Sequence, residues 1–330
     1  DRMATPNLKW ETNLNFNVGI DFSLFNNRFS GSFDFFTRRS KDLLYSRPIA
    51  PSLGYGSIDE NVGALKNTGI EMVLNGTIIN QNGWVWKLGM NLTHYKNKVT
   101  DLPLKDMPQS GVNKLQVGRS VYDFYMIEWA GVDPENGDPL WYMDEEDENH
   151  NPTGKRVTTN DYGSADYYYV NKSSLPKVYG GFNTSLSWKG FDLSAIFAYS
   201  IGGYIYNRDI TMILHNGSLE GRDWSTEIPD NRNTDVPALS TTTNNWNSAS
   251  TRFLQNNSYM RLKNLTLSYN LPKQWISKLS LSSVQVYVQG DNLFTIHRNQ
   301  GLDPEQGITG ITYYRYPAMR TISGGINVSF

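Results

Sequence analysis

The sequence predicts an all-β fold, a transmembrane antiparallel β-barrel, from three observations. Runs of about ten residues alternate between apolar and polar side chains, as strands between two different solvents do. The connections between these runs are short and long in strict turn. The composition, with 13% aromatic residues, 28 Gly and only 19% charged residues, favours strands and turns over helices.

The composition also excludes several classes of protein. A formal net charge of −2 provides no basic field, so we expect no nucleic-acid partner. The sequence contains no Cys, which rules out disulfides and thiolate metal sites within it. No stretch approaches the roughly 18 apolar residues of a membrane-spanning helix. Averaged hydropathy does not reveal a barrel, because each of its strands is apolar on one face only.

The clearest strand covers residues 14 to 24, where even-numbered residues are apolar and odd-numbered residues are polar or Gly. The Asn26–Asn27 pair predicts a tight turn, because Asn tolerates positive φ. Alternation then resumes over residues 29 to 35, with Phe at three of the four apolar-face positions. These two runs predict a hairpin.

Three further hairpins and one closing strand follow the same rule. The expected strand pairs are residues 69–79 with 84–96, 178–188 with 191–201, and 265–269 with 284–291. The closing stretch, residues 319–330, places Ile322, Ile326, Val328 and Phe330 on one face. Each run approaches the nine to eleven residues that a tilted strand needs to cross the hydrocarbon. We therefore predict about ten strands.

The lengths of the connections give the strands a direction. The long connections span about residues 39–66, 97–177, 203–257 and 295–318, whereas loops beyond about 12 to 15 residues are uncommon in compact domains. Long loops at every second connection are typical of a barrel with short periplasmic turns and long extracellular loops. The apolar faces would then contact the lipid bilayer and the polar faces a wet lumen. A soluble β-sandwich, propeller or carbohydrate-binding module is the alternative.

Five segments carry a resemblance to a known family. They read NLKWET at 7–12, KNTGIE at 66–71, WAGVDP at 129–134, YMRLKNLTLSY at 259–269 and GDNLF at 290–294. In order and spacing they resemble the barrel of the SusC/RagA family of TonB-dependent outer-membrane transporters. The resemblance implies a barrel of about 22 strands in the bacterial outer membrane. Residues 1–330 would be its C-terminal portion, with the signal peptide, plug domain and N-terminal strands absent from this chain.

The same resemblance implies a function. The protein would import a large nutrient, an oligosaccharide or a peptide, as the barrel subunit of a SusCD-like complex. Its partners would be a SusD-like surface lipoprotein over the long loops and TonB, acting through the absent plug region. A passive porin or structural outer-membrane scaffold that binds partners through its loops is the second hypothesis. A soluble carbohydrate-binding β module is the third.

No group of residues indicates an enzyme or a cofactor site. His94, His150, His215 and His297 are scattered, without metal-ligand spacing or a nucleophile signature. We therefore expect no catalysis and no cofactor. The acidic run Asp144–Glu148 lies in the longest loop, where a solvated crest is the simpler interpretation and a calcium ion bound by carboxylates is the alternative.

Aromatic residues form two candidate sets. Next to the short turns, Trp84, Trp86, Trp188 and Phe330 suit a membrane-interface girdle. In the long loops, exposed Trp and Tyr rings would stack on substrate or fill pockets of the lid protein, with self-packing within the loops as the alternative for each. These loop candidates are Trp129, Trp141, Tyr142, Tyr167, Tyr168, Trp224, Trp246, Tyr313 and Tyr314.

Overall fold

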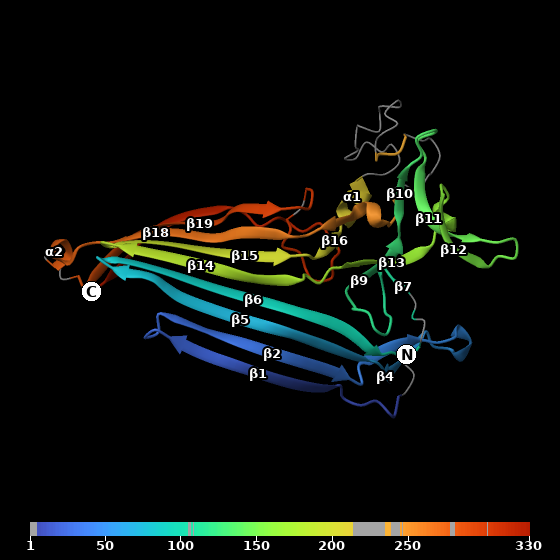
Figure 1. Cartoon of the computed structure of the whole chain (residues 1–330), viewed down its shortest axis with the longest axis horizontal. Coiled ribbons are helices and arrows are strands. Elements are labelled where there is room, and N and C mark those ends of the chain that lie inside the picture. The colour runs from blue at the N-terminus through green and yellow to red at the C-terminus, as the bar shows by residue number, and fades with distance from the viewer. Residues whose placement is uncertain are drawn as a thin grey trace.

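A curved antiparallel sheet dominates the fold (Figure 1). The computed structural model describes residues 5–104, 107, 109–213, 235–238, 245, 247–277, 281–301 and 303–330. The main sheet has nine strands in the order β1-β2-β5-β6-β14-β15-β18-β19-β20. Their bounds are Thr12–Leu24, Phe29–Lys41, Ala64–Gln81, Trp84–Asp101, Val178–Trp188, Phe191–Ile201, Tyr259–Asn270, Ser283–His297 and Thr321–Ser329.

The order of the strands confirms the predicted antiparallel meander. Each strand of the main sheet follows its neighbour along the chain, and the described residues give nine strands where about ten were expected. The short turns and helix α2 (Lys273–Ile276) gather at one end of the sheet, and the long connections gather at the other (Figure 1). We call these the turn end and the loop end.

The register places the predicted apolar residues on one continuous face. Leu186 of β14 lies opposite Trp86 on one side and Leu193 on the other, and Leu267 of β18 lies opposite Val288. Because directly opposed residues share a face, the apolar positions align from strand to strand. The two-faced wall expected of a barrel is confirmed.

The short turns follow from residues that adopt positive φ. Asn26 and Asn27 have φ of 56° and 64°, as predicted for the first hairpin. Asn82 and Lys189, each followed by Gly, have φ of 51° and 46°. In the two-residue turns at 82–83 and 189–190, two successive residues at positive φ give the twist that matches two antiparallel strands. The first hairpin has a four-residue loop at 25–28, in which Phe25 also has positive φ.

Several strands are longer than their alternating runs. β2 continues to Lys41 and β6 to Asp101, beyond the predicted ends near residues 38 and 96. Backbone pairing does not depend on the apolar–polar pattern, so the strands continue after the pattern ends. Periodicity therefore located the alternating part of each strand rather than its end.

The long connections contain structure of their own at the loop end. Small sheets form between β3 and β4 and between β16 and β17. A three-stranded sheet has the order β10-β11-β12, and a four-stranded sheet has the order β13-β9-β8-β7. No helix among the described residues is long and apolar enough to cross a membrane. The strand bounds are Leu44–Pro48 (β3), Ser57–Asn61 (β4), Gln109–Ser110 (β7), Asn113–Lys114 (β8), Asp123–Ile127 (β9), Trp129–Val132 (β10), Pro139–Glu146 (β11), Pro152–Thr159 (β12), Tyr167–Ser173 (β13), Tyr204–Tyr206 (β16) and Leu254–Asn256 (β17), with helix α1 at Arg208–Ile213 and 3-10 turns at Pro51–Leu53, Tyr162–Ser164 and Thr251–Phe253.

Candidate functional site at the loop end

Three long connections fold together into one unit, which we call the loop-end module. It comprises the described residues of 107–173, 203–213, 247–257 and 303–318. Its core consists of buried apolar residues from two of these connections, with Ile311 of the third packed against them. The core residues are Val112, Phe124, Met126, Tyr206 and Phe253. The loops therefore share a hydrophobic core and are not independent excursions from the wall.

Backbone hydrogen bonds join the same connections. The N–H of Tyr206 donates to the carbonyl of Gly310 at 2.7 Å, and that of Thr312 donates to the carbonyl of Tyr206 at 3.2 Å. The N–H of Trp129 donates to Oγ1 of Thr251 at 2.9 Å. Because these bonds link residues about 100 positions apart, the module holds its surface side chains in fixed relative positions.

A buried ion pair fastens residues 303–318, which we call the strap, to the wall. The guanidinium of Arg261 in β18 donates to Asp303 at 2.5 Å and to Glu305 at 2.6 Å, and the side chains of Arg261 and Asp303 are only 4% and 7% exposed. Burial alone would raise the pKa of Asp303, but hydrogen bonds from the Ala318 N–H and from Arg261 hold it below its ordinary value. Charge-assisted bonds of this kind are among the stronger hydrogen bonds in proteins.

The strap presents exposed aromatic rings. The carboxylate of Asp209 accepts from the N–H of Tyr314 at 3.1 and 3.2 Å, which orders this part of the strap. Tyr313 and Tyr314 are 50% and 64% exposed, and their role as contact residues stays a prediction. Tyr316, two residues further on, is 99% exposed, and the sequence pattern did not point to it.

A cluster of tyrosines forms a second aromatic surface on β9 and β13. The ring centre of Tyr125 lies 5.8 Å from that of Tyr167 and 4.8 Å from that of Tyr169. Lys114 Nζ lies 5.0 Å from the Tyr125 ring, and the Arg119 guanidinium lies 4.0 Å from the Tyr169 ring. Aromatic faces flanked by cations are suited to stack on a sugar ring or on a peptide side chain. The sequence pattern did not point to Tyr125 or Tyr169 as contact residues, although Tyr169 shares a strand face with Tyr167.

Other predicted loop aromatics pack inside the module. Trp141 is fully buried, with ring centres of Trp129 and Tyr162 at 5.8 and 5.2 Å. Tyr142 is half-buried in the same strand. For Trp141 the structure corrects the expectation of a surface contact: its ring lies in the packing between loops, so it offers no surface to substrate or lid.

Tyr168 also faces away from the tyrosine surface. Its hydroxyl donates to Asp144 at 2.9 Å, and the Arg156 guanidinium lies 3.6 Å from its ring centre. Burial, followed by the hydrogen bond to Asp144, raises the pKa of Tyr168. Its half-buried ring stabilises the hairpin of β11 and β12. The two remaining candidates, Trp224 and Trp246, lie outside the described residues.

A pocket of about 400 Å³ lies between the strap and the wall. Five tyrosines line it together with strap residues 304, 306–308 and 310. Tyr95 and Tyr179 among them meet edge to face, with ring centres 6.4 Å apart. The sequence could have indicated Tyr95 and Tyr179 as site residues, because each occupies a polar-face position at the loop end of its strand. The five are Tyr95, Tyr179, Tyr199, Tyr204 and Tyr259.

The acidic run Asp144–Glu148 does not gather into a metal site. The carboxylate of Asp147 accepts from the backbone N–H groups of Asn151 and Asn149 at 3.0 and 2.8 Å, and these bonds lower its pKa. Within the described ranges, no group of three or more His, Asp or Glu side chains is arranged to hold a metal ion. The run forms part of the hairpin of β11 and β12 and its turn.

The residues predicted for a membrane girdle lie at the turn end. Trp84 and Trp188 are directly opposed, with ring centres 4.8 Å apart and nearly parallel planes. The indole N–H of Trp86 donates to Oγ1 of Thr184 at 2.9 Å. Phe330, which follows β20, is 91% exposed. These residues lie at one rim of the apolar face, and their role in a membrane girdle stays a prediction.

The amino-acid sequence matches a family model over most of its length. The model is described as TonB dependent receptor-like, beta-barrel, and the match covers residues 2–293. TonB-dependent receptor P3 of Formosa agariphila is 32% identical over 356 residues, which cover 99% of this chain and 35% of that protein. TonB-dependent receptor SusC of Bacteroides thetaiotaomicron is 29% identical, over 98% of this chain and 32% of that protein.

A solved structure has the same arrangement of strands. The structure of the RagAB peptide transporter matches with a TM-score of 0.87 at 33% identity, over 99% of this chain and 36% of that chain. The chain thus spans about a third of the length of the relatives it matches.

Proposed function

The chain belongs to the TonB-dependent receptor-like β-barrel family, and from this premise we propose that it forms part of the wall of an active outer-membrane importer. The resemblance to the SusC/RagA family is confirmed by the relatives. Proteins of this family are bacterial outer-membrane proteins, and they are transporters rather than enzymes. The proposed cargo is a large nutrient, an oligosaccharide or a peptide.

One observation carries the proposal, namely the contrast between the two ends of a wall with an apolar and a polar face. The apolar face lets the sheet stand in lipid, while the amide and hydroxyl side chains of the other face line a wet passage. All short turns lie at one end, and the loop-end module presents Tyr167, Tyr313 and Tyr314 at the other. Capture at the loop end and passage along the polar face follow from this arrangement.

The edges of the sheet support a role within a larger barrel. In the described part of the chain, β1 pairs only with β2, and β20 pairs only with β19. Unpaired backbone groups at a sheet edge are costly in lipid, so strands that span a membrane form closed barrels. We therefore propose that further strands pair with β1 and β20, and that residues 1–330 are the C-terminal portion of a barrel of about 22 strands.

The proposed partners follow from the same arrangement. A SusD-like surface lipoprotein would cover the loop-end module, whose exposed Tyr rings provide the apolar contacts that protein interfaces favour. TonB would act from the periplasm through a plug domain inside the barrel. The barrel itself would supply shape, a polar lumen and the docking surface for the lid.

Uptake assays in intact cells test this proposal. Cells that express the complete transporter are given fluorescently labelled oligopeptides from a protein digest or labelled oligosaccharides, with and without a functional tonB gene. We expect uptake of one class to require both the transporter and TonB. Uptake that persists without TonB would support a passive porin, and no uptake of either class would favour a structural scaffold.

A further inference from the structure

We propose that the outward rim of β2, β5 and β6 binds phosphate groups of lipids in the outer leaflet of the membrane. The proposal rests on Arg39, Lys66 and Lys98, which we call the cation row. Arg39 lies directly opposite Lys66, and Lys66 lies directly opposite Lys98. Three exposed cations thus stand side by side on three neighbouring strands.

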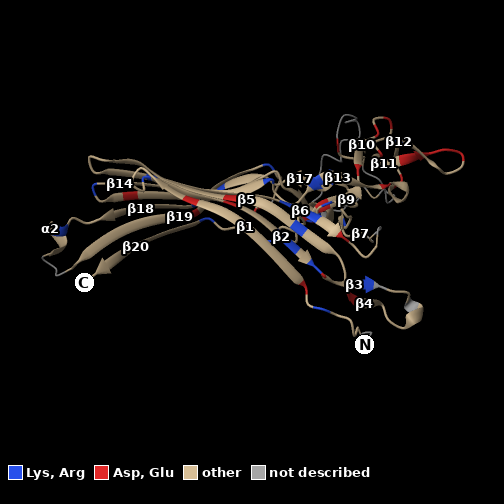
Figure 2. Cartoon of the chain, turned by 60° about the horizontal axis from the view of Figure 1, so that its bottom comes forward, with Lys and Arg blue, Asp and Glu red and all other residues tan. Residues whose placement is uncertain are grey.

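The cation row projects from the apolar face of the wall. Phe35, Ile70 and His94 form the opposed set four residues nearer the turn end of the same three strands. Because side chains alternate between faces, residues four apart on one strand point the same way. The row therefore faces the membrane side and not the lumen. Figure 2 shows Lys and Arg on β2 and β6 as these strands approach the loop end.

Cations outnumber carboxylates on the face of the row. Asp21, Asp34 and Glu71 occupy inward positions, whereas Asp101 of β6 lies opposite Ala64 and lines a pocket together with Arg39 and Lys41. Among the described residues, no ion pair involves a member of the cation row. Like charges directly opposed on a sheet are destabilising, and an anion lying across the row would remove that cost.

The height of the row matches lipid headgroups. Arg39 comes ten residues after Phe29 at the turn end of β2, and Lys98 comes fourteen residues after Trp84 at the turn end of β6. At about 3.3 Å per residue and a tilt of about 40°, ten residues rise about 25 Å, which is the height of the apolar band of such barrels. The row therefore begins where the hydrocarbon ends and rises into the headgroup layer on the loop side.

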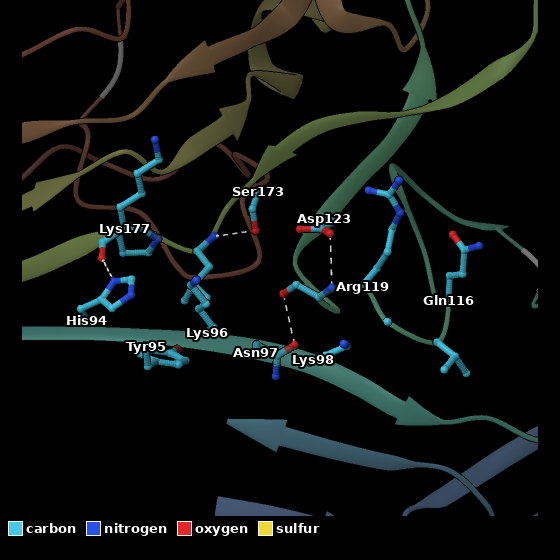
Figure 3. Close-up of a pocket in the computed structure, with 15 residues that line it drawn as sticks. His94, Tyr95, Lys96, Asn97, Lys98, Gln116, Arg119, Asp123, Ser173 and Lys177 are labelled. Carbon is cyan, nitrogen blue, oxygen red and sulfur yellow. Dashed lines mark hydrogen bonds between the residues drawn. The ribbon is translucent and has the colours of Figure 1, made fainter. Parts of the chain in front are cut away.

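A pocket of about 710 Å³ extends the basic surface beside β6 (Figure 3). Lys96 and Lys98 line it from the strand, and Arg119 and Lys177 line it from two loop segments. Asp123 is the only acid among the described residues that line this pocket. The pocket thus offers a phosphate group cations from three chain segments, which a solvated row of lysines on a flat rim would not provide.

Neutralising the row in the complete transporter tests the proposal. The probe is lipid A with its phosphates, titrated into the detergent-solubilised protein, and we compare the wild type with the R39Q/K66Q/K98Q variant. We expect about 100-fold weaker binding, because each basic residue near an anionic surface contributes about fivefold. The control variant R38Q/K87Q/K155Q removes the same charge from inward and loop positions, and its affinity should equal that of the wild type.

Two further probes decide between sources of phosphate. Dephosphorylated lipid A should bind the wild type as weakly as intact lipid A binds the triple variant. Inorganic phosphate should neither bind with the affinity of the lipid nor displace it. Equal binding of the two lipids, equal affinity of wild type and triple variant, or displacement by inorganic phosphate would overturn the proposal.

A single substitution covers the case in which the triple variant does not assemble. Lys66→Gln removes the central cation, and we expect about fivefold weaker binding of lipid A from this change alone. Assembly of each variant is checked by its resistance to unfolding in SDS at room temperature. An assembled Lys66→Gln protein with wild-type affinity would also overturn the proposal, and none of these measurements depends on which nutrient is imported.

Discussion

The wall and the loop-end module place their apolar side chains in opposite ways. In the wall, Ile20 and Ile326 are 66% and 65% exposed on the outer face. In the module, Phe124 and Trp141 are completely buried among other side chains. The wall is built for lipid on one face and water on the other, whereas the module follows the rules of a water-soluble domain. One chain thus contains a wall suited to lipid on its outer face and a module suited to water.

This difference shows which part of the chain depends on specific side-chain contacts. The wall gains its stability from pairing and from lipid, so many apolar residues are interchangeable at its outer positions. The module depends on individual partners, because polar groups buried in it are costly unless they are paired. The ion pair of Arg261 with Asp303, which we call the junction, links the wall and the module, since Arg261 belongs to a strand of the wall and Asp303 to the strap.

The largest expected effect comes from breaking this junction with Arg261→Met. The substitution leaves the buried carboxylate of Asp303 without its counter-charge, and removing one partner of a buried ion pair costs about 3–5 kcal/mol. We expect the strap to detach. Hydrogen exchange of strap amides such as Thr312 should accelerate more than about a hundredfold, while exchange in β18 and β19 changes little.

Lys263→Met is the matched control for this prediction. Lys263 also pairs with Glu305, at 2.9 Å, but its side chain is 36% exposed. Exposed pairs typically contribute only about 0–1 kcal/mol, so strap exchange should hardly change. Equal effects of the two substitutions would show that burial does not determine the strength of the junction.

The wall could be predicted from sequence because its physics is periodic. Each strand faces lipid and water in alternation, so residues such as Val18, Phe33 and Ile326 carry the signal locally. The turn residues Asn26 and Asn27 carry a local signal as well, through their tolerance of positive φ. The strand order followed from the lengths of the connections, and no long-range contact had to be known.

The loop-end module could not be predicted in the same way. Its core joins Phe124, Tyr206 and Ile311 from three separate connections, and no local pattern states that these residues meet. Trp141 and Tyr167 are both loop aromatics in sequence, yet one is buried and the other exposed. Only the tertiary arrangement separates packing residues from candidate contacts.

A charge placed on either face of β20 tests the two-solvent description of the wall. Ile326→Arg puts a cation on the lipid face, which costs about 2–4 kcal/mol near the bilayer midplane. Asn327→Arg is the matched control, because Asn327 is on the polar face and faces the lumen. The urea midpoint of the complete transporter in bilayers should fall clearly for the first variant only. Equal tolerance would reverse or remove the assigned orientation.

A smaller effect is expected from one hydrogen bond of the module. The hydroxyl of Tyr162 donates to the carbonyl of Ala249 at 2.9 Å, and burial raises the pKa of Tyr162, which keeps this group protonated. Tyr162→Phe should cost about 0.5–1.5 kcal/mol, measured as faster amide exchange over residues 247–256. Tyr313→Phe, at an exposed ring, is the control. An equal change in both variants would contradict a role for this bond.

The smallest effect concerns pH, and it again separates the junction from the wall. The pKa of Asp303 is held below its ordinary value by the Ala318 N–H and by Arg261, despite burial. A group whose pKa is lowered by folding contributes stability that is fully present above its unfolded pKa, about 3.9 for Asp, and is lost as pH falls through the lower folded value. Strap exchange, corrected for its intrinsic pH dependence, should therefore be the same at pH 7.5 and pH 5. Detachment within that range would require a group with a raised pKa and would contradict this account of the junction. Below about pH 4 the strap should loosen before the wall, because protonation of Asp303 removes the counter-charge of Arg261, whereas backbone pairing holds the strands of the wall together.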